Sequence, residues 1–94
     1  MYYILNGHDV VAVSVEKWGL WFGEADRGVA KSTIGDATIS TVFLGIDHSW
    51  DGPPPMLFET MVFGGLLDEE QERCSTWAEA KVMHKQMCER VNSL

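Results

Sequence analysis

The stretch Ser40–Gly65, STVFLGIDHSWDGPPPMLFETMVFGG, is the most informative part of this chain and contains most of the candidate functional side chains. It joins two apolar runs, 37–46 and 56–63, whose composition predicts β-strands on either side of a loop. Three successive prolines, Pro53 to Pro55, fix an extended backbone and make the loop a rigid connector. The two runs are apolar on both faces, a pattern typical of strands that are covered on each side.

Four further segments have the composition of short strands or loops. Two β-prone runs, 2–5 and 10–13, are separated by Asn6-Gly7, and Asn-Gly favours a hairpin because both residues tolerate the positive φ of a type I′ turn. A strand is also predicted at 29–34, followed by a tight turn before residue 37. The acidic segment 66–73 is either a solvated loop or a short edge strand.

Two helices are predicted from capping residues and apolar spacing. Ser14 is the expected N-cap of the first, and Gly28 its expected C-cap. Thr76 opens the second with a capping box, because Glu79 can reach back to the cap amide. The apolar stripe of the second helix docks it on the sheet and consists of Trp77, Ala80, His84, Met87 and Val91.

These elements occur in the order ββ-α-βββ-α and predict one α+β domain over residues 1–94, with a mainly antiparallel sheet. Two helices are too little material to cover both faces of that sheet. Four tryptophans and four phenylalanines are also many for so short a chain, and some of them are expected to cover a ligand or a partner. We therefore expect a homo-oligomer.

Charge and composition exclude several classes of function. The formal charge of −7 and the lack of a basic cluster argue against binding to nucleic acid or to anionic membranes. The N-terminus does not resemble a signal peptide, and no apolar run approaches the roughly 20 residues that span a bilayer. Cys74 and Cys88 form no metal-ligand or redox pattern, and reduced thiols are expected. We expect a soluble, intracellular protein without a cofactor.

The loop and the helix stripe supply the first candidate ligand-binding residues. Asp47 and His48 are adjacent at a strand end, where alternation directs neighbouring side chains to opposite faces. His48 is a candidate general base, metal ligand or hydrogen-bond donor to a phosphate, or else a loop histidine that caps a backbone carbonyl. Trp50 and Trp77 offer stacking surfaces for a base or ring, or else pack in the core or at its rim.

Glu59 interrupts an apolar strand face, where a carboxylate without a partner is unfavourable. Either it pairs with Arg27, Lys31 or a backbone donor, or it lines a cavity. Pairing across the 48–55 loop brings Glu59 toward Phe43 and Gly45, and the missing side chain at Gly45 leaves space over the carboxylate.

Catalytic signatures are absent from the chain. It has no P-loop, GxGxxG, HExxH or GxSxG motif. Asp47, His48, Asp51 and Glu59 would be the material for a hydrolytic metal site, but no spacing among them is typical of one. We therefore expect no enzyme, and assign no catalytic residue and no metal ligand.

Three segments carry a resemblance: the stretch quoted above, EKWGLWFGEADRGVA from residue 16, and STWAEA from residue 75. Together they resemble a family of small uncharacterised proteins encoded by tailed bacteriophages. This resemblance implies action in the cytoplasm of the bacterial host. It supplies no catalytic residues to carry over.

Two functions of different classes follow. The first is an anti-defence protein whose homo-oligomer pockets bind and sequester a nucleotide-type signal. The second is a protein–protein inhibitor of a host enzyme or defence protein, acting through an aromatic surface with an acidic rim. A small metal-dependent hydrolase is the third. The ligand-binding set expected for the first consists of Asp47, His48, Trp50, Glu59, Trp77, Arg27 and Lys31.

Overall fold

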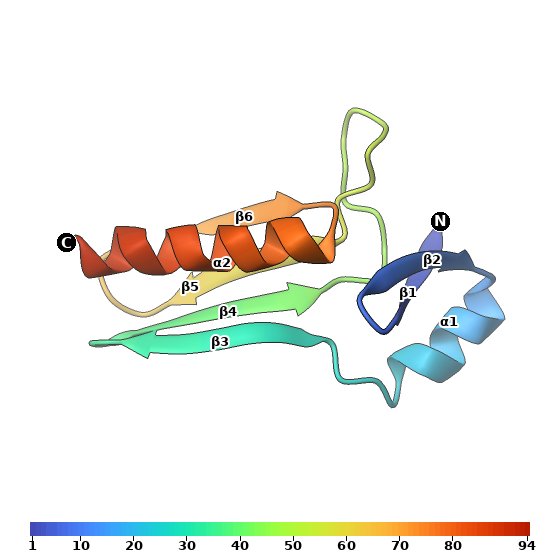
Figure 1. The fold of residues 1–94 in the computed structure, drawn as a ribbon, viewed down its shortest axis with the longest axis horizontal. Coiled ribbons are helices and arrows are strands. Elements are labelled where there is room, and N and C mark those ends of the chain that lie inside the picture. Colours follow the sequence, from blue (N-terminus) through green and yellow to red (C-terminus); the bar gives the residue numbers. More distant parts are fainter.

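Two antiparallel sheets and two helices make up the computed structural model, which describes residues 1–94 (Figure 1). The α+β class and the mainly antiparallel sheet are confirmed. The acidic segment forms an edge strand, which adds a fourth strand to the predicted run of three. The elements are β1 (Tyr2–Asn6), β2 (Asp9–Val13), α1 (Val15–Phe22), β3 (Gly28–Ile34), β4 (Ala37–Phe43), β5 (Phe58–Phe63), β6 (Gln71–Cys74) and α2 (Trp77–Asn92).

The larger sheet has the strand order β3-β4-β5-β6, with every neighbouring pair antiparallel. Strict alternation in β4 and β5 buries one side chain in two, so one face of the sheet is core and the other is open. Helix α2 lies on the core face, where Thr76 and Glu79 form the predicted capping box. The fully buried apolar side chains of β4 and β5 are Ile39, Phe43, Phe58 and Val62.

A chain of polar side chains crosses the core between α2 and the sheet. His84 Nδ1 lies 2.7 Å from Thr41 Oγ1, and His84 Nε2 lies 2.9 Å from Ser32 Oγ. Thr41 is also hydrogen-bonded to Thr60 on β5. Because every member has a partner, this buried network avoids the penalty of unpaired polar groups and joins α2 to three strands.

The first hairpin turns one residue later than the sequence predicts. Asn6 pairs with Asp9, so the central residues are Gly7 and His8. Only Gly7 has a positive φ, +64°, which fits a type II′ turn rather than the predicted type I′. The shift places His8 on Trp77, with ring centroids 3.9 Å apart and planes 7° from parallel.

Two predicted boundaries differ from the structure more than the others do. Helix α1 begins after the Ser14 N-cap as expected, but it ends at Phe22 with Gly23 as the cap, well before Gly28. Strand β4 ends at Phe43 rather than residue 46, because Gly45 adopts a φ of +79° and turns the chain toward β1. There the backbone N–H of Tyr3 donates to the Gly45 carbonyl at 2.9 Å.

The second face of the four-stranded sheet is covered by neither helix. Its apolar side chains are Val42, Met61 and Phe63, and Phe63 is 51% exposed. Thr38 and Ser40 lie beside them on β4, so the face mixes apolar groups with hydroxyls. Neither helix combines the length and the apolar character that crossing a bilayer requires.

Candidate functional site

The segment 47–56 connects β4 to β5 and projects beyond the end of the sheet (Figure 1). Asp47 ties its two ends together, because Oδ1 accepts hydrogen bonds from the backbone amides of Ser49 at 2.8 Å and Met56 at 2.9 Å. These two amides hold the pKa of Asp47 below its ordinary value. The backbone amide of His48 also donates to the Met56 carbonyl, at 3.0 Å. Asp47 therefore organises the loop, and it is not among the residues that line the hollow described next.

Trp50 is the most exposed large apolar side chain of the loop, with 94% of its surface open to water. Below it lies a hollow of about 390 Å³. His48 and Arg73 contribute the positively charged or protonatable groups of its lining. The remaining lining residues are Ser49, Asp51, Gly52, Pro53, Pro54 and Met56. The structure thus brings together two of the predicted residues, His48 and Trp50.

Glu59 is paired, but with a residue that the sequence did not indicate. Arg73 Nε on β6 donates to Glu59 Oε2 at 2.9 Å across the β5–β6 pair. Glu59 lies on the open face of the sheet, opposite Val42 rather than Gly45. The predicted space over the carboxylate does not exist, since a Cβ at Gly45 would meet Trp18 Nε1 at 2.8 Å.

The two basic residues expected near Glu59 lie elsewhere. The Arg27 guanidinium carbon sits 3.9 Å from the centroid of the Phe22 ring, a cation–π contact beside α1. Lys31 is on β3, at the opposite edge of the sheet from Arg73. Three strand spacings, roughly 14 Å, separate those edges. Arg27 and Lys31 therefore do not converge on the loop.

Trp77 also lies away from the loop hollow. It is the first residue of α2, stacked on His8 and in edge contact with Phe58 at a centroid distance of 6.3 Å. Its ring joins the β1–β2 hairpin to the core, as expected if Trp77 packs at the rim of the core.

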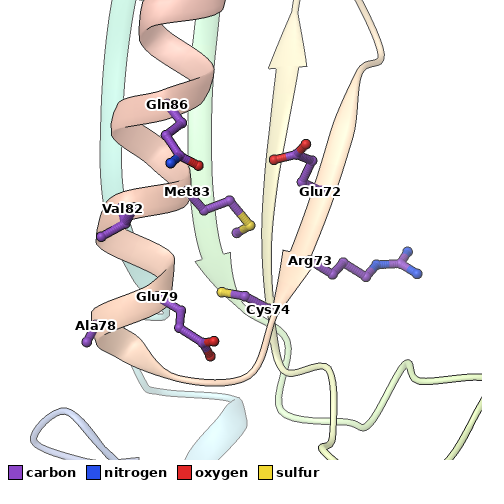
Figure 2. Close-up of a pocket in the computed structure, with 8 residues that line it drawn as sticks. All are labelled: Glu72, Arg73, Cys74, Ala78, Glu79, Val82, Met83 and Gln86. Carbon is purple, nitrogen blue, oxygen red and sulfur yellow. The ribbon is translucent and has the colours of Figure 1, made fainter.

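A second hollow, of about 480 Å³, runs between α2 and β6 (Figure 2). In that view the sulfur atoms of Met83 and Cys74 point into the space between the helix and the strand, while Arg73 points away from the helix. Burial, and then the charge of Glu79, raises the pKa of the Cys74 thiol to about 11, so the thiol stays protonated at neutral pH. No motif in the sequence indicates this groove, because the groove exists only when residues 71–74 form an edge strand.

No group of three or more His, Cys, Asp or Glu side chains in the chain could hold a metal ion. Asp47, His48, Asp51 and Glu59 accordingly do not form the assembly considered from the sequence.

No model of a protein family matches this chain, and neither curated proteins nor solved structures give a match.

Proposed function

We propose that this chain is a protein-binding factor that docks on a partner protein through the 47–56 loop, with Trp50 as its anchor. The exposure of Trp50 is the observation that carries the proposal. Tryptophan is enriched among the few residues that dominate binding at protein interfaces. Asp47 ties the loop at both ends, so little conformational order has to be gained on binding.

The proposed partner is a protein of a bacterial host. The resemblance to tailed-phage proteins implies action in the host cytoplasm during infection, on a host enzyme or a defence protein. The net charge of −7 favours a partner whose apolar pocket has a basic rim, because complementary potentials speed encounter and disfavour wrong partners. Covering that surface would inhibit the partner.

Capture from a bacterial lysate tests the proposal with three immobilised proteins: the wild type, Trp50→Ala and Leu66→Ala. Leu66 is the matched control, since it is 87% exposed and lies after β5, away from the loop. A host protein retained by the wild type and by Leu66→Ala, but lost with Trp50→Ala, supports docking through the loop. The affinity of the purified partner should then fall at least about tenfold with Trp50→Ala. An identical set of proteins on all three would contradict the proposal.

Sequestration of a nucleotide-type signal is the second candidate, and one observation favours it. Trp50, His48 and Arg73 line the same hollow, so a base could stack on the indole while a phosphate meets the guanidinium. Its volume of about 390 Å³ falls within the range of small-ligand pockets, roughly 300–1,000 Å³. In the predicted form the pockets belong to a homo-oligomer, which would associate through the open face of the sheet.

Native mass spectrometry with cyclic dinucleotides, cyclic trinucleotides and ADP-ribose derivatives tests the second candidate. Retention of one nucleotide intact at integral stoichiometry would support sequestration. A chemically altered nucleotide would indicate an enzyme instead. If the protein binds none of the nucleotides, both sequestration and enzymatic conversion of those ligands would be contradicted.

A further inference from the structure

We infer that the outer edge of β6 takes an added β-strand: an extended, basic segment of a partner protein pairs with β6 and places alternate apolar side chains in the groove beside α2. This surface shares Arg73 with the hollow at the Trp50 loop, but the inference does not depend on the function proposed above. Three observations carry it, namely the free edge, the groove and the charge around both.

Strand β6 is the last strand of the sheet, and nothing pairs with its outer edge. The Glu70 carbonyl accepts a hydrogen bond from the backbone N–H of Val62 on β5, and Glu72 is paired with Thr60. These two positions show which backbone groups of β6 point toward β5 and which point away from the sheet. In an antiparallel pair, only alternate residues exchange hydrogen bonds with the neighbouring strand. The backbone N–H and C=O of Gln71 and Arg73 therefore point outward, as a ready template for another chain.

The groove lies where an added strand would direct every second side chain. Its apolar lining comes from both walls: Cys74 on β6, and Val82 and Met83 on α2 (Figure 2). Val82 is 56% exposed, although it is apolar and belongs to a well-capped helix. Main-chain pairing combined with pockets for alternate side chains is the way in which sheet edges recognise extended peptides.

The surroundings of the groove are acidic, and this charge favours a basic segment as the occupant. Glu72 and Glu79 line it, and Glu69 and Glu70 immediately precede β6. The two guanidinium groups near the groove are already paired: Arg73 with Glu59 at 2.9 Å, and Arg90 with Glu70 at 3.3 Å and Glu72 at 3.8 Å. A segment with Lys or Arg between its apolar residues complements this charge. A second copy of the chain would instead bring like carboxylates together, which disfavours pairing of β6 with itself.

A display library of random peptides of about ten residues, long enough to pass β6, tests the inference. The library is selected for binding to three immobilised proteins in parallel: the wild type, Gln71→Pro and Gln71→Ala. Proline removes an outward N–H that the fold does not use, whereas alanine keeps it. We expect peptides that alternate Lys or Arg with apolar residues to be enriched on the wild type and on Gln71→Ala. Their affinity for Gln71→Pro should be lower by roughly tenfold.

Two further measurements keep the result decisive if Gln71→Pro folds poorly. Two N-methylated forms of a selected peptide should be compared, one methylated at its odd positions and one at its even positions. One form should lose binding and the other should keep it, because only one of the two sets of N–H groups faces β6. Val82→Lys should weaken the same peptide, and Val82→Ala much less. Acidic consensus sequences, peptides indifferent to N-methylation, no enrichment at all, or a dimer that forms through β6 would each overturn the inference.

Discussion

His84 joins α2 to the sheet through hydrogen bonds to Ser32 and Thr41. It lies between two apolar clusters, one around Ile39 and Met87 and the other around Phe43 and Phe58. A polar group at this position favours one register of the helix on the sheet, because a shift along the axis would leave buried hydroxyls without partners.

Replacing His84 by alanine should lower the free energy of unfolding by about 2–3 kcal/mol, since it leaves a cavity, removes the hydrogen-bond partner of the Ser32 hydroxyl and leaves Thr41 with Thr60 alone. Urea denaturation measures the change. Lys85→Ala is the control, because Lys85 is exposed on the same helix and should change the free energy of unfolding little. Equal effects of the two substitutions would contradict the structural role of His84.

The same residue makes stability depend on pH. Burial, and then the charge of Lys81, lowers the pKa of His84 below its ordinary value. The unfolded chain then takes up a proton near pH 6.5 that the folded chain resists, so the contribution is complete above about pH 6.5 and is lost as the pH falls toward the folded pKa. Denaturation at a series of pH values should show this decline in the wild type. It should be smaller in His84→Gln, which cannot titrate.

Gly45 illustrates two separate constraints at one position. Its φ of +79° disfavours any side chain, and the Trp18 indole occupies the space that a Cβ would need. Gly7 is the matched control, since it has a φ of +64° and nothing within 4 Å of a built Cβ. Gly7→Ala should lower the free energy of unfolding by about 1–2 kcal/mol from backbone strain alone. Gly45→Ala should lower it further, and similar values for the two would show that Trp18 moves aside freely.

At the level of elements, the 47–56 loop depends on a single carboxylate. Asp47→Ala removes the acceptor for the amides of Ser49 and Met56, and both should then exchange hydrogen faster by NMR. Asp47→Asn keeps an oxygen acceptor and should protect them better. Because the pKa of Asp47 is lowered, its contribution is present above the unfolded value of 3.8 and is lost as the pH falls through the folded pKa. Unchanged exchange in Asp47→Ala would mean that the loop is held by other contacts.

Residues close together in the sequence were enough to predict most helices and strands. Contacts between residues far apart in the sequence determine where several of these helices and strands end. The capping box of α2 and the N-cap of α1 depend on neighbours in sequence, and both are confirmed. The C-terminus of α1 and the end of β4 depend on the packing of Trp18 and Phe22 against Gly45, which no short window of sequence reveals. The hairpin turn shifted by one residue because Gly7 alone supplies the positive φ.

The site was predicted only in part, for the same reason. His48 and Trp50 were identified because prolines and aromatic residues concentrate in one short loop. Arg73 was not among the predicted ligand-binding residues, because its place beside the hollow, and its pairing with Glu59, arise only when residues 71–74 form β6. Arg27 and Lys31 were chosen for their charge, without knowledge of the strand order that separates Lys31 from Glu59.

At the level of the whole molecule, the open face of the sheet is the surface through which we expect copies to associate. Phe63 is 51% exposed there, Met61 lies two residues before it on β5, and Val42 lies further along the same face, opposite Glu59. If the homo-oligomer forms through this face, Phe63→Glu should shift the mass measured by native mass spectrometry to that of a monomer. Leu20→Glu on the exposed side of α1 is the control. A monomeric wild type would contradict the prediction.

Arg73 lines both hollows, the one beneath the loop and the groove beside α2. Its guanidinium can occupy one position at a time, and Glu59 holds it when neither hollow is filled. A partner that draws Arg73 toward the loop alters the lining of the groove, and a strand added to β6 alters the loop hollow in turn. Such linkage is reciprocal in free energy, so each occupant would change the affinity of the other by the same factor. One side chain would thereby make the binding of two different partners cooperative or mutually exclusive.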